Sequence, residues 1–296
     1  MKKTLVIGSS VCDVIIRLPH IPHPQEDINI IKQTLSIGGC AYNVSQMLRY
    51  YDVPYTLFSP VGTGIYGDFV KKHFKENNIP IILESSYQNG CCYCLVDDSK
   101  DRTFICEHGA EYIFEKEWFD SLQCDDYHQV YICGLEIEEN SGDVIIDFLM
   151  NHPHFKIYFA PGPRITHINK KRMDRLLTLH PVLHLNQQEI ISYTKEKDIY
   201  KAPRKIYEIT QEIIIITLGQ EGCYCFDGKK DILIPAIKTE VVDTIGAGDG
   251  HIGAFIANQA LSFSIYDSLL KANEMAAEIV NHQGATLNNI IHHISK

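Results

Sequence analysis

Short apolar runs alternate along most of the chain with segments whose apolar residues recur at helical spacing. The apolar runs predict β-strands at residues 5–7, 55–59, 80–83, 130–133, 156–159, 182–185 and 213–217. The periodic segments between them predict helices at residues 42–51, 69–76, 141–150, 169–179 and 199–210. Alternation of this kind predicts an α/β fold with a mainly parallel central sheet that is covered by helices on both faces.

Two regions interrupt the alternation. Residues 11–36 and 90–106 read as extended segments with turns, and the polar run at residues 97–101 predicts a hairpin. No helix is predicted between these pieces. The chain shows no internal repeat, low-complexity stretch or flexible linker, so residues 1–296 are expected to form a single domain from which both segments project.

The most informative motif is V-V-D-T-I-G-A-G-D at residues 241–249. An apolar, strand-like run ends at Asp243, and a tightly packed helix is predicted at residues 252–257. A glycine-rich turn that opens a helix presents free backbone N–H groups and the positive end of the helix dipole, which suits a phosphate. Asp249 would repel a resting phosphate there, so its expected task is to take a proton from a hydroxyl group that attacks the phosphate.

This motif resembles the DTxGAGD signature of the PfkB (ribokinase-like) carbohydrate kinases. Other motifs of that family match in order along the chain: GGxxxN at residues 38–43, NxxE at 186–189, TxGxxG at 217–222, and an adenine-side helix and loop at Asn273 followed by Gly284-Ala285. The matches span almost the whole chain. The resemblance implies a ribokinase-like fold in which the two extended segments form a small β-lid over the substrate.

The resemblance also implies ATP-dependent phosphorylation of a hydroxyl group of a small sugar or nucleoside. Asp249 would be the general base. The anion hole for the transferring phosphoryl group would consist of the backbone N–H groups of Gly246, Ala247 and Gly248. The substrate would be bound by Asp13, Gly38, Gly39 and Asn43. The two glycines of this set would let the backbone approach the ligand closely.

The cofactors implied by the family are ATP and Mg²⁺. The residues expected to bind ATP are Asn186, Thr217, Gly219, Gly222 and Asn273. Glu189 is expected to organise Mg²⁺ through water, because this ion uses few protein carboxylates. Asn186 and Glu189 equally fit a helix capping box, and both interpretations stay open at this point. Asp243 and Thr244 match a monovalent-cation loop of some relatives, and lid-to-lid pairing would give a homodimer.

A second glycine motif offers a competing interpretation. G-T-G-I-Y-G at residues 62–67 follows a strand and opens a helix, and Glu84 lies where a ribose-binding acid is expected, which would fit an NAD-dependent oxidoreductase. The motif lies in the second strand–helix unit, whereas such fingerprints usually occupy the first. A catalytically silent sugar-binding regulator is another alternative, and the intact segment 246–249 argues against it.

Some residues depart from the family pattern or bear on the choice of substrate. His251 stands where an aromatic residue is common, and Ala160 stands where many relatives carry Asp. A sugar phosphate needs cationic side chains in the lid or pocket. The only evident candidates in the sequence for that task are Arg17, Lys32 and Arg102. So small a number of cations favours an unphosphorylated acceptor.

Composition excludes other function classes. The chain has 296 residues and a formal net charge of −10, which argues against a nucleic-acid surface. No apolar run has membrane-spanning length and the first residues enter a strand without a signal peptide, so a cytoplasmic protein with no membrane partner is expected. The ten cysteines lack zinc-ligand spacing and are expected to be buried, reduced thiols, with Cys92 and Cys94 on one strand face and Cys223 and Cys225 on another.

Overall fold

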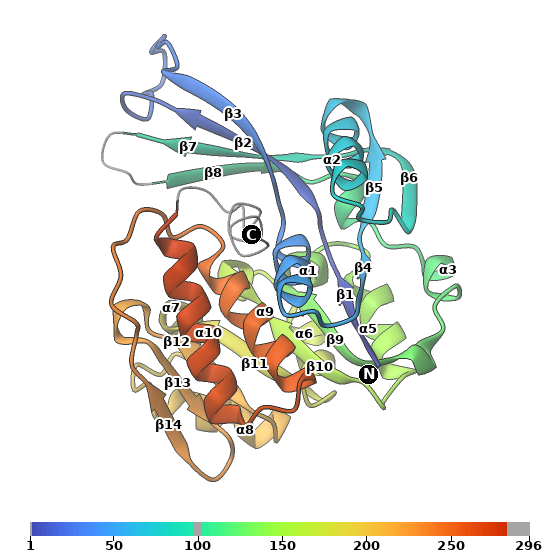
Figure 1. Ribbon diagram of the computed structural model, residues 1–296, viewed down its shortest axis with the longest axis vertical. Helices are drawn as coiled ribbons and strands as arrows, with labels where there is room; N and C mark the ends of the chain where they lie inside the picture. Colours follow the sequence, from blue (N-terminus) through green and yellow to red (C-terminus); the bar gives the residue numbers. More distant parts are fainter. Residues whose placement is uncertain (1, 98–101, 283–296) are drawn as a thin grey trace.

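The centre of the molecule is an eight-stranded sheet with the strand order β14-β13-β12-β11-β10-β9-β1-β4 (Figure 1). The computed structural model describes residues 2–97 and 102–282. The strands are β1 Lys3–Ile7, β4 Tyr55–Phe58, β9 Tyr127–Cys133, β10 Lys156–Ala160, β11 Val182–Asn186, β12 Ile214–Thr217, β13 Cys223–Phe226 and β14 Asp231–Ile234. The six strands β4, β1, β9, β10, β11 and β12 run parallel to one another. Strands β13 and β14 extend the β12 edge in antiparallel pairing. The predicted α/β fold with a mainly parallel sheet is confirmed.

Helices cover both faces of this sheet, because alternate side chains of a strand point to opposite faces. Val6 of β1 packs in a buried cluster with helices α1 Cys40–Tyr50, α2 Gly64–Glu76, α9 Ala247–Ala260 and α10 Ile265–Val280. Its neighbours Leu5 and Ile7 pack in the other cluster with α3 Lys116–Phe119, α4 Gly134–Glu138, α5 Gly142–Met150, α6 Lys170–Leu177, α7 Gln187–Thr194 and α8 Ala202–Thr210. None of the helices in the described ranges is long and apolar enough to cross a membrane.

A second, four-stranded sheet lies across the top of the molecule in Figure 1. Its order is β3-β2-β7-β8, with β2 Val11–Arg17, β3 Lys32–Gly38, β7 Cys91–Val96 and β8 Arg102–Glu107. Both segments expected to form a lid therefore contribute to one sheet, which we call the lid sheet, and its strands extend slightly past the predicted ends. The predicted hairpin tip at residues 98–101 lies outside the described residues.

Two predicted elements are wrong in position. The strand expected at residues 80–83 begins only at Leu83, as β6 Leu83–Gln88, which pairs with β5 Pro60–Thr63 in a separate two-stranded sheet. Helix α2 begins at Gly64 rather than at residue 69, because the glycine-rich turn itself forms its first turn. The remaining predicted strands and helices are present with shifts of a few residues at their ends.

All ten cysteines are free thiols. Cys223 and Cys225 are both fully buried on one face of β13, as expected. The expectation of buried thiols is wrong for Cys106, which is exposed, and Cys40, Cys92 and Cys124 are only half-buried. Cys92 and Cys106 belong to the lid sheet, where the strands are not enclosed on both faces by helices.

Candidate active site

The residues expected at the active site converge where the central strands end. Ser9 follows β1, Gly134 follows β9, and Asn186 closes β11. The N-terminus of α9 reaches the same place, since the Asn43 amide of α1 donates a hydrogen bond to Asp249 of α9. Ligands of parallel α/β sheets bind at this edge, so the structure places the candidate residues where the fold favours a site.

Asp249 is the third residue of α9 and is half-buried. Desolvation raises the pKa of its carboxyl group, while hydrogen bonds from Asn43 and Cys40 act in the opposite direction. The Asn43 Nδ2–Asp249 Oδ2 distance is 2.8 Å. The amide therefore fixes the orientation of the carboxylate. A carboxyl group with a raised pKa is a better general base near neutral pH.

Asp13 lies on β2 of the lid sheet, opposite the start of α1. A Cβ atom added at Gly38 would stand 2.1 Å from Asp13 Oδ2, so only glycine admits the carboxylate there. Gly39 has a φ of 99° and its Cβ would stand 2.4 Å from the Ser9 carbonyl oxygen. Desolvation raises the pKa of Asp13 to about 7, and the charges of Cys106 and Asp249 add to this effect.

Glu136 of α4 completes this acidic group, and sequence reasoning missed it. It is fully buried, and its Oε1 accepts a hydrogen bond of 2.8 Å from the Ser9 backbone N–H. Its Oε2, together with Ser10 Oγ and Asn43 Oδ1, is buried without a hydrogen-bond partner among the described residues. Buried polar atoms are normally paired, so these atoms fit a ligand rich in hydroxyl groups. The available signal was its place just after β9, at the same edge as Asn186.

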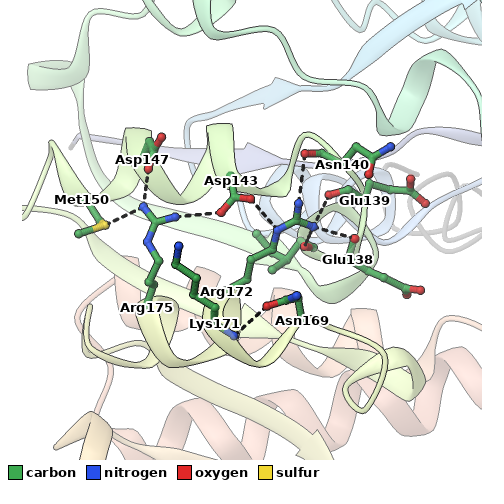
Figure 2. A network of polar contacts seen from close by, with 11 residues as sticks. Glu138, Glu139, Asn140, Asp143, Asp147, Met150, Asn169, Lys171, Arg172 and Arg175 are labelled. Carbon is green, nitrogen blue, oxygen red and sulfur yellow. Dashed lines mark hydrogen bonds and ion pairs between the residues drawn. The ribbon is translucent and has the colours of Figure 1, made fainter.

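Helix α4, which carries Glu136, is held at its C-terminal end by Arg172 (Figure 2). The Arg172 Nη1 atom donates to the carbonyl oxygens of Ile137, Glu138 and Glu139, and its Nε donates to Asp143 at 2.9 Å. A cation at the C-terminus satisfies the carbonyl groups that the helix leaves open and complements the helix dipole. This short helix, and with it Glu136, is therefore anchored from α6.

The N-terminus of α9 contains the three residues that are expected to form the anion hole. Gly246 is the residue before the helix and has a φ of 77°. Gly246 and Gly248 make no backbone N–H hydrogen bond within the described residues, but the Ala247 N–H donates to Thr244 O at 3.3 Å. A Cβ atom at Gly248 would meet nothing within 4 Å, so open space lies in front of it. The geometry thus offers two of the three predicted donors directly, and the third is committed to the turn.

Asn186 and Glu189 form the capping box that was one of the two open interpretations. The Asn186 side chain accepts from the Glu189 N–H at 2.8 Å, and Glu189 Oε2 accepts from the Asn186 N–H at 2.9 Å. Glu189 Oε1 also accepts from Asn186 Nδ2. Each oxygen keeps a second lone pair, so a water-mediated magnesium role remains compatible with the cap. Burial raises the pKa of the Glu189 carboxyl group, and the charge of Asp249 adds to this effect.

The expected nucleotide residues differ in what the structure asks of them. Gly222 has a φ of 101° and its Cβ would stand 2.0 Å from the Ile234 carbonyl oxygen, so it serves close packing in the fold. Gly219 is exposed, has a φ of 59°, and faces open space. The Thr217 hydroxyl group contacts the Leu185 carbonyl oxygen at 3.5 Å. Their roles toward ATP stay predictions, and Gly219 is the one whose position leaves room for a ligand.

Asn273 belongs to a buried polar chain that explains His251. The Asn273 amide donates to the carbonyl oxygens of Ile234 and Pro235, so its oxygen must accept, and it accepts from His251 Nε2 at 3.1 Å. His251 Nδ1 then accepts from His184 Nε2 at 2.9 Å. Burial lowers the pKa of His251 to about 4 and also lowers that of His184, so both rings are neutral. The adenine role of Asn273 stays a prediction, because both of its amide hydrogens are engaged within the protein; Gly284-Ala285 lie outside the described residues.

The loop before α9 is tied to the lid sheet. Arg102 Nη2 of β8 lies 2.6 Å from Asp243 Oδ1, and Asp243 also accepts from the Ile245 N–H at 2.8 Å. Asp243 is buried. A lid strand and the phosphate-side loop are therefore joined by an ion pair, and the monovalent-cation role of Asp243 and Thr244 stays a prediction.

The glycine motif at residues 62–67 serves packing. The Gly62 N–H donates to Asn89 Oδ1 at 2.5 Å, and a Cβ at Gly62 would stand 2.3 Å from the Tyr87 carbonyl oxygen. A Cβ at Gly67 would stand 2.5 Å from Gly62 O. The turn also follows β5, which lies outside the central sheet. Gly62 and Gly67 therefore serve the close approach of two backbones.

Comparison with known proteins agrees with this geometry. The family model described as "pfkB family carbohydrate kinase" matches residues 1–291. The chain belongs to the pfkB family of carbohydrate kinases. It is 28% identical, over 96% of its length and 90% of the relative's, to an uncharacterized sugar kinase of Escherichia coli. The predicted enzyme class is confirmed, and the NAD-dependent oxidoreductase and silent-regulator alternatives are set aside.

Solved ribokinase structures share the fold of this chain over nearly its whole length. A ribokinase from Thermotoga maritima superposes with a TM-score of 0.82 at 19% identity, covering 100% of this chain and 99% of its own. An Arabidopsis thaliana ribokinase solved with ribose and ATP superposes with a TM-score of 0.80 at 19% identity, covering 96% and 94%. At this identity the likeness shows the ribokinase-like fold, and the roles of individual side chains stay predictions.

The raised pKa of Asp13 leads to a stability prediction. The folded state binds the proton of the Asp13 carboxyl group more tightly than the unfolded state does. The contribution of this proton to the free energy of unfolding is therefore fully present below about pH 4 and is lost as pH rises through about 7. Asp13→Asn should therefore raise the free energy of unfolding by about 1–2 kcal/mol at pH 8, after allowance for solvent screening, and by much less at pH 5. Urea unfolding at both pH values measures this difference.

Asp120→Asn is the matched control, because Asp120 is exposed beyond the end of α3. It should change stability by less than about 0.5 kcal/mol at either pH. An Asp13→Asn effect of equal size at pH 5 and pH 8 would show that desolvation does not govern this carboxylate.

Proposed function

We propose that this pfkB-family kinase transfers the γ-phosphoryl group of ATP to a hydroxyl group of a small, unphosphorylated sugar or nucleoside. The observation that carries the proposal is the α9 N-terminus. There the Asp249 carboxylate, oriented by Asn43, stands one residue from the open space in front of Gly248. A base and an anion site adjoin at the sheet edge where the polar atoms of Ser10 and Glu136 lack partners.

The steps follow from the residues of this chain. Asp13, Asn43 and Glu136 would bind the acceptor hydroxyl groups, which orients the reactive oxygen toward Asp249. Asp249 would accept that hydroxyl proton as the oxygen attacks, and the Gly246 and Gly248 N–H groups would stabilise charge on the transferring group. Mg²⁺, when bound with ATP, supplies neutralisation of phosphate charge, and Glu189 would orient its waters.

An unphosphorylated acceptor is favoured by where the cations lie. Arg102 is paired with Asp243 on the phosphate-donor side. Arg17 and Lys32 are paired in register at the outer end of the lid sheet. Arg17 lies four residues along β2 from Asp13, so the backbones of these two residues are about 13 Å apart. The acidic groups Asp13, Glu136 and Asp249 would repel a sugar phosphate. Among the described residues these cations therefore do not form a phosphate pocket beside Asp13.

The proposal extends to assembly and location. Exposed apolar side chains lie on both edge strands of the lid sheet, Leu35 on β3 and Phe104 and Ile105 on β8. Such edges favour pairing with a second copy, so we propose a homodimer through the lids, and light scattering that shows only monomer would contradict it. The ten free thiols favour a reducing, cytoplasmic location.

A ligand-shift experiment tests the nucleotide. A ligand that binds only the folded state stabilises it by RT ln(1 + [L]/Kd), about 2.7 kcal/mol at a hundredfold excess over Kd. MgATP should therefore raise the melting temperature, and NAD at equal concentration should not. A screen of ATP consumption over sugars and nucleosides then identifies the acceptor. A melting temperature that NAD raises and MgATP leaves unchanged would overturn the proposal.

A further inference from the structure

A pair of cysteines lies beside the substrate carboxylate in the lid sheet. β2 pairs with β7 so that Asp13 stands next to Cys92, and β7 pairs with β8 so that Cys92 stands opposite Cys106. Neighbours across strands share a face of the sheet, so all three side chains lie in one row. The Cys92 and Cys106 sulfur atoms are 3.2 Å apart.

The backbone already has the spacing that a disulfide needs. Residues that stand directly opposite in an antiparallel pair have Cα atoms about 4.5 or 5.5 Å apart. Both values fall within the range of about 4.4–6.8 Å that disulfides span. The bond therefore requires side-chain rotation and no movement of β7 against β8.

The two thiols are unequal in a way that suits an attacking and a resolving cysteine. Cys106 is exposed, whereas Cys92 is half-buried. Contact with Cys92 and with His108 lowers the pKa of Cys106, and the charge of Arg164 adds to this, while the same contact raises the pKa of Cys92. Thiolates are the reactive form, so Cys106 is the thiol that an oxidant meets first.

The other face of the lid sheet offers no rival pair. Cys12 and Cys91 are also neighbours in register, but both are fully buried against Tyr66 and Phe69 of α2. An oxidant in water reaches the Asp13 face before it reaches this one.

We propose that Cys92 and Cys106 are a redox modification site directly beside Asp13. Oxidation by hydrogen peroxide joins the two cysteines in a reversible disulfide. The Cys106 thiolate attacks a peroxide oxygen, so an S–O bond forms, the O–O bond breaks, and the departing hydroxide takes a proton to become water. The Cys92 sulfur then attacks the Cys106 sulfenic acid. The S–S bond forms, the S–O bond breaks, and the Cys92 proton leaves with the hydroxide as a second water. A dithiol reductant restores both thiols by exchange.

The test treats the full-length reduced protein with hydrogen peroxide near neutral pH and maps non-reduced peptides by mass spectrometry. The expected product joins Cys92 to Cys106 and is reversed by dithiothreitol. Cys106→Ser should abolish this product, whereas Cys92→Ser should leave a sulfenic acid at Cys106 that dimedone traps. Cys124→Ser is the matched control, because Cys124 is a half-buried thiol outside the lid sheet and its loss should leave the product unchanged.

The opposite results are equally clear. A pair that stays reduced while other cysteines oxidise, or a disulfide that joins other positions, overturns the proposal. So does dimedone capture of Cys106 in the unmutated protein without any disulfide. Peptide mapping needs no phosphoryl transfer, so failure here is distinguishable from failure of the kinase assignment.

Discussion

Asp249→Asn should lower kcat by about 10²–10⁴-fold while the affinity for MgATP and the melting temperature stay close to those of the unmutated protein. The substituted amide keeps an oxygen that can accept the hydrogen bond now made from Asn43 Nδ2 at 2.8 Å. It cannot accept the proton of an attacking hydroxyl group. Removal of a negative charge near the phosphates also leaves ATP binding unchanged or slightly tighter.

The chain provides a matched control in Asp267. It is the third residue of α10, as Asp249 is the third residue of α9, and it is capped by Ser264 at the helix start. Asp267→Asn should leave kcat unchanged and shift stability by no more than about 0.5 kcal/mol. Single-turnover measurement with the acceptor from the ATP screen separates the two. If Asp249→Asn keeps near-normal turnover, Asp249 is only a helix residue and the assigned base is wrong.

Gly248→Ala should remove most activity without loss of stability. The added methyl group would meet nothing within 4 Å in the fold, and the backbone there is not in the left-handed region. It would project into the open space where the anion-hole proposal puts the transferring phosphoryl group. Disturbing one such donor site costs about 10²–10³-fold in kcat. The measured kcat should therefore fall while the melting temperature stays unchanged.

Gly253→Ala on the same helix is the converse control. Its Cβ would stand 2.7 Å from Met47 Cβ, where α9 packs on α1. Overpacking of this kind typically costs about 1–3 kcal/mol, so the melting temperature should fall while the catalytic groups remain in place. If Gly248→Ala instead retains full activity, the space before α9 is not the phosphoryl site.

The parts of the site that sequence could predict are those fixed by local backbone chemistry. A glycine turn before a helix determines its own geometry, so the positions of Gly246 and Asp249 follow from a short motif. The NxxE motif likewise folds as the capping box that its spacing allows. The order of strands and helices was readable because buried parallel strands are continuous apolar runs.

The parts that sequence could not predict depend on contacts between distant segments. Glu136 carries no motif, and its role becomes visible only when β9 is laid beside β1 and Ser9 donates to it. The strand expected at residues 80–83 shows the same limit, since the apolar run packs as a connection and the pairing partner β5 decides where β6 begins. The exposure of Cys106 depends on its place in an edge strand, which composition does not reveal.

The neutral chain from His184 through His251 to Asn273 limits how this sequence can diverge. Exchange of His251 for phenylalanine would leave a donor on His184 and an acceptor on Asn273 buried without partners. Each buried group that loses its partner costs about 1–3 kcal/mol, so replacement of His251 alone should destabilise the folded protein. Lineages that carry His251 should therefore also carry polar residues at both partner positions, and these three sites should be inherited as a set.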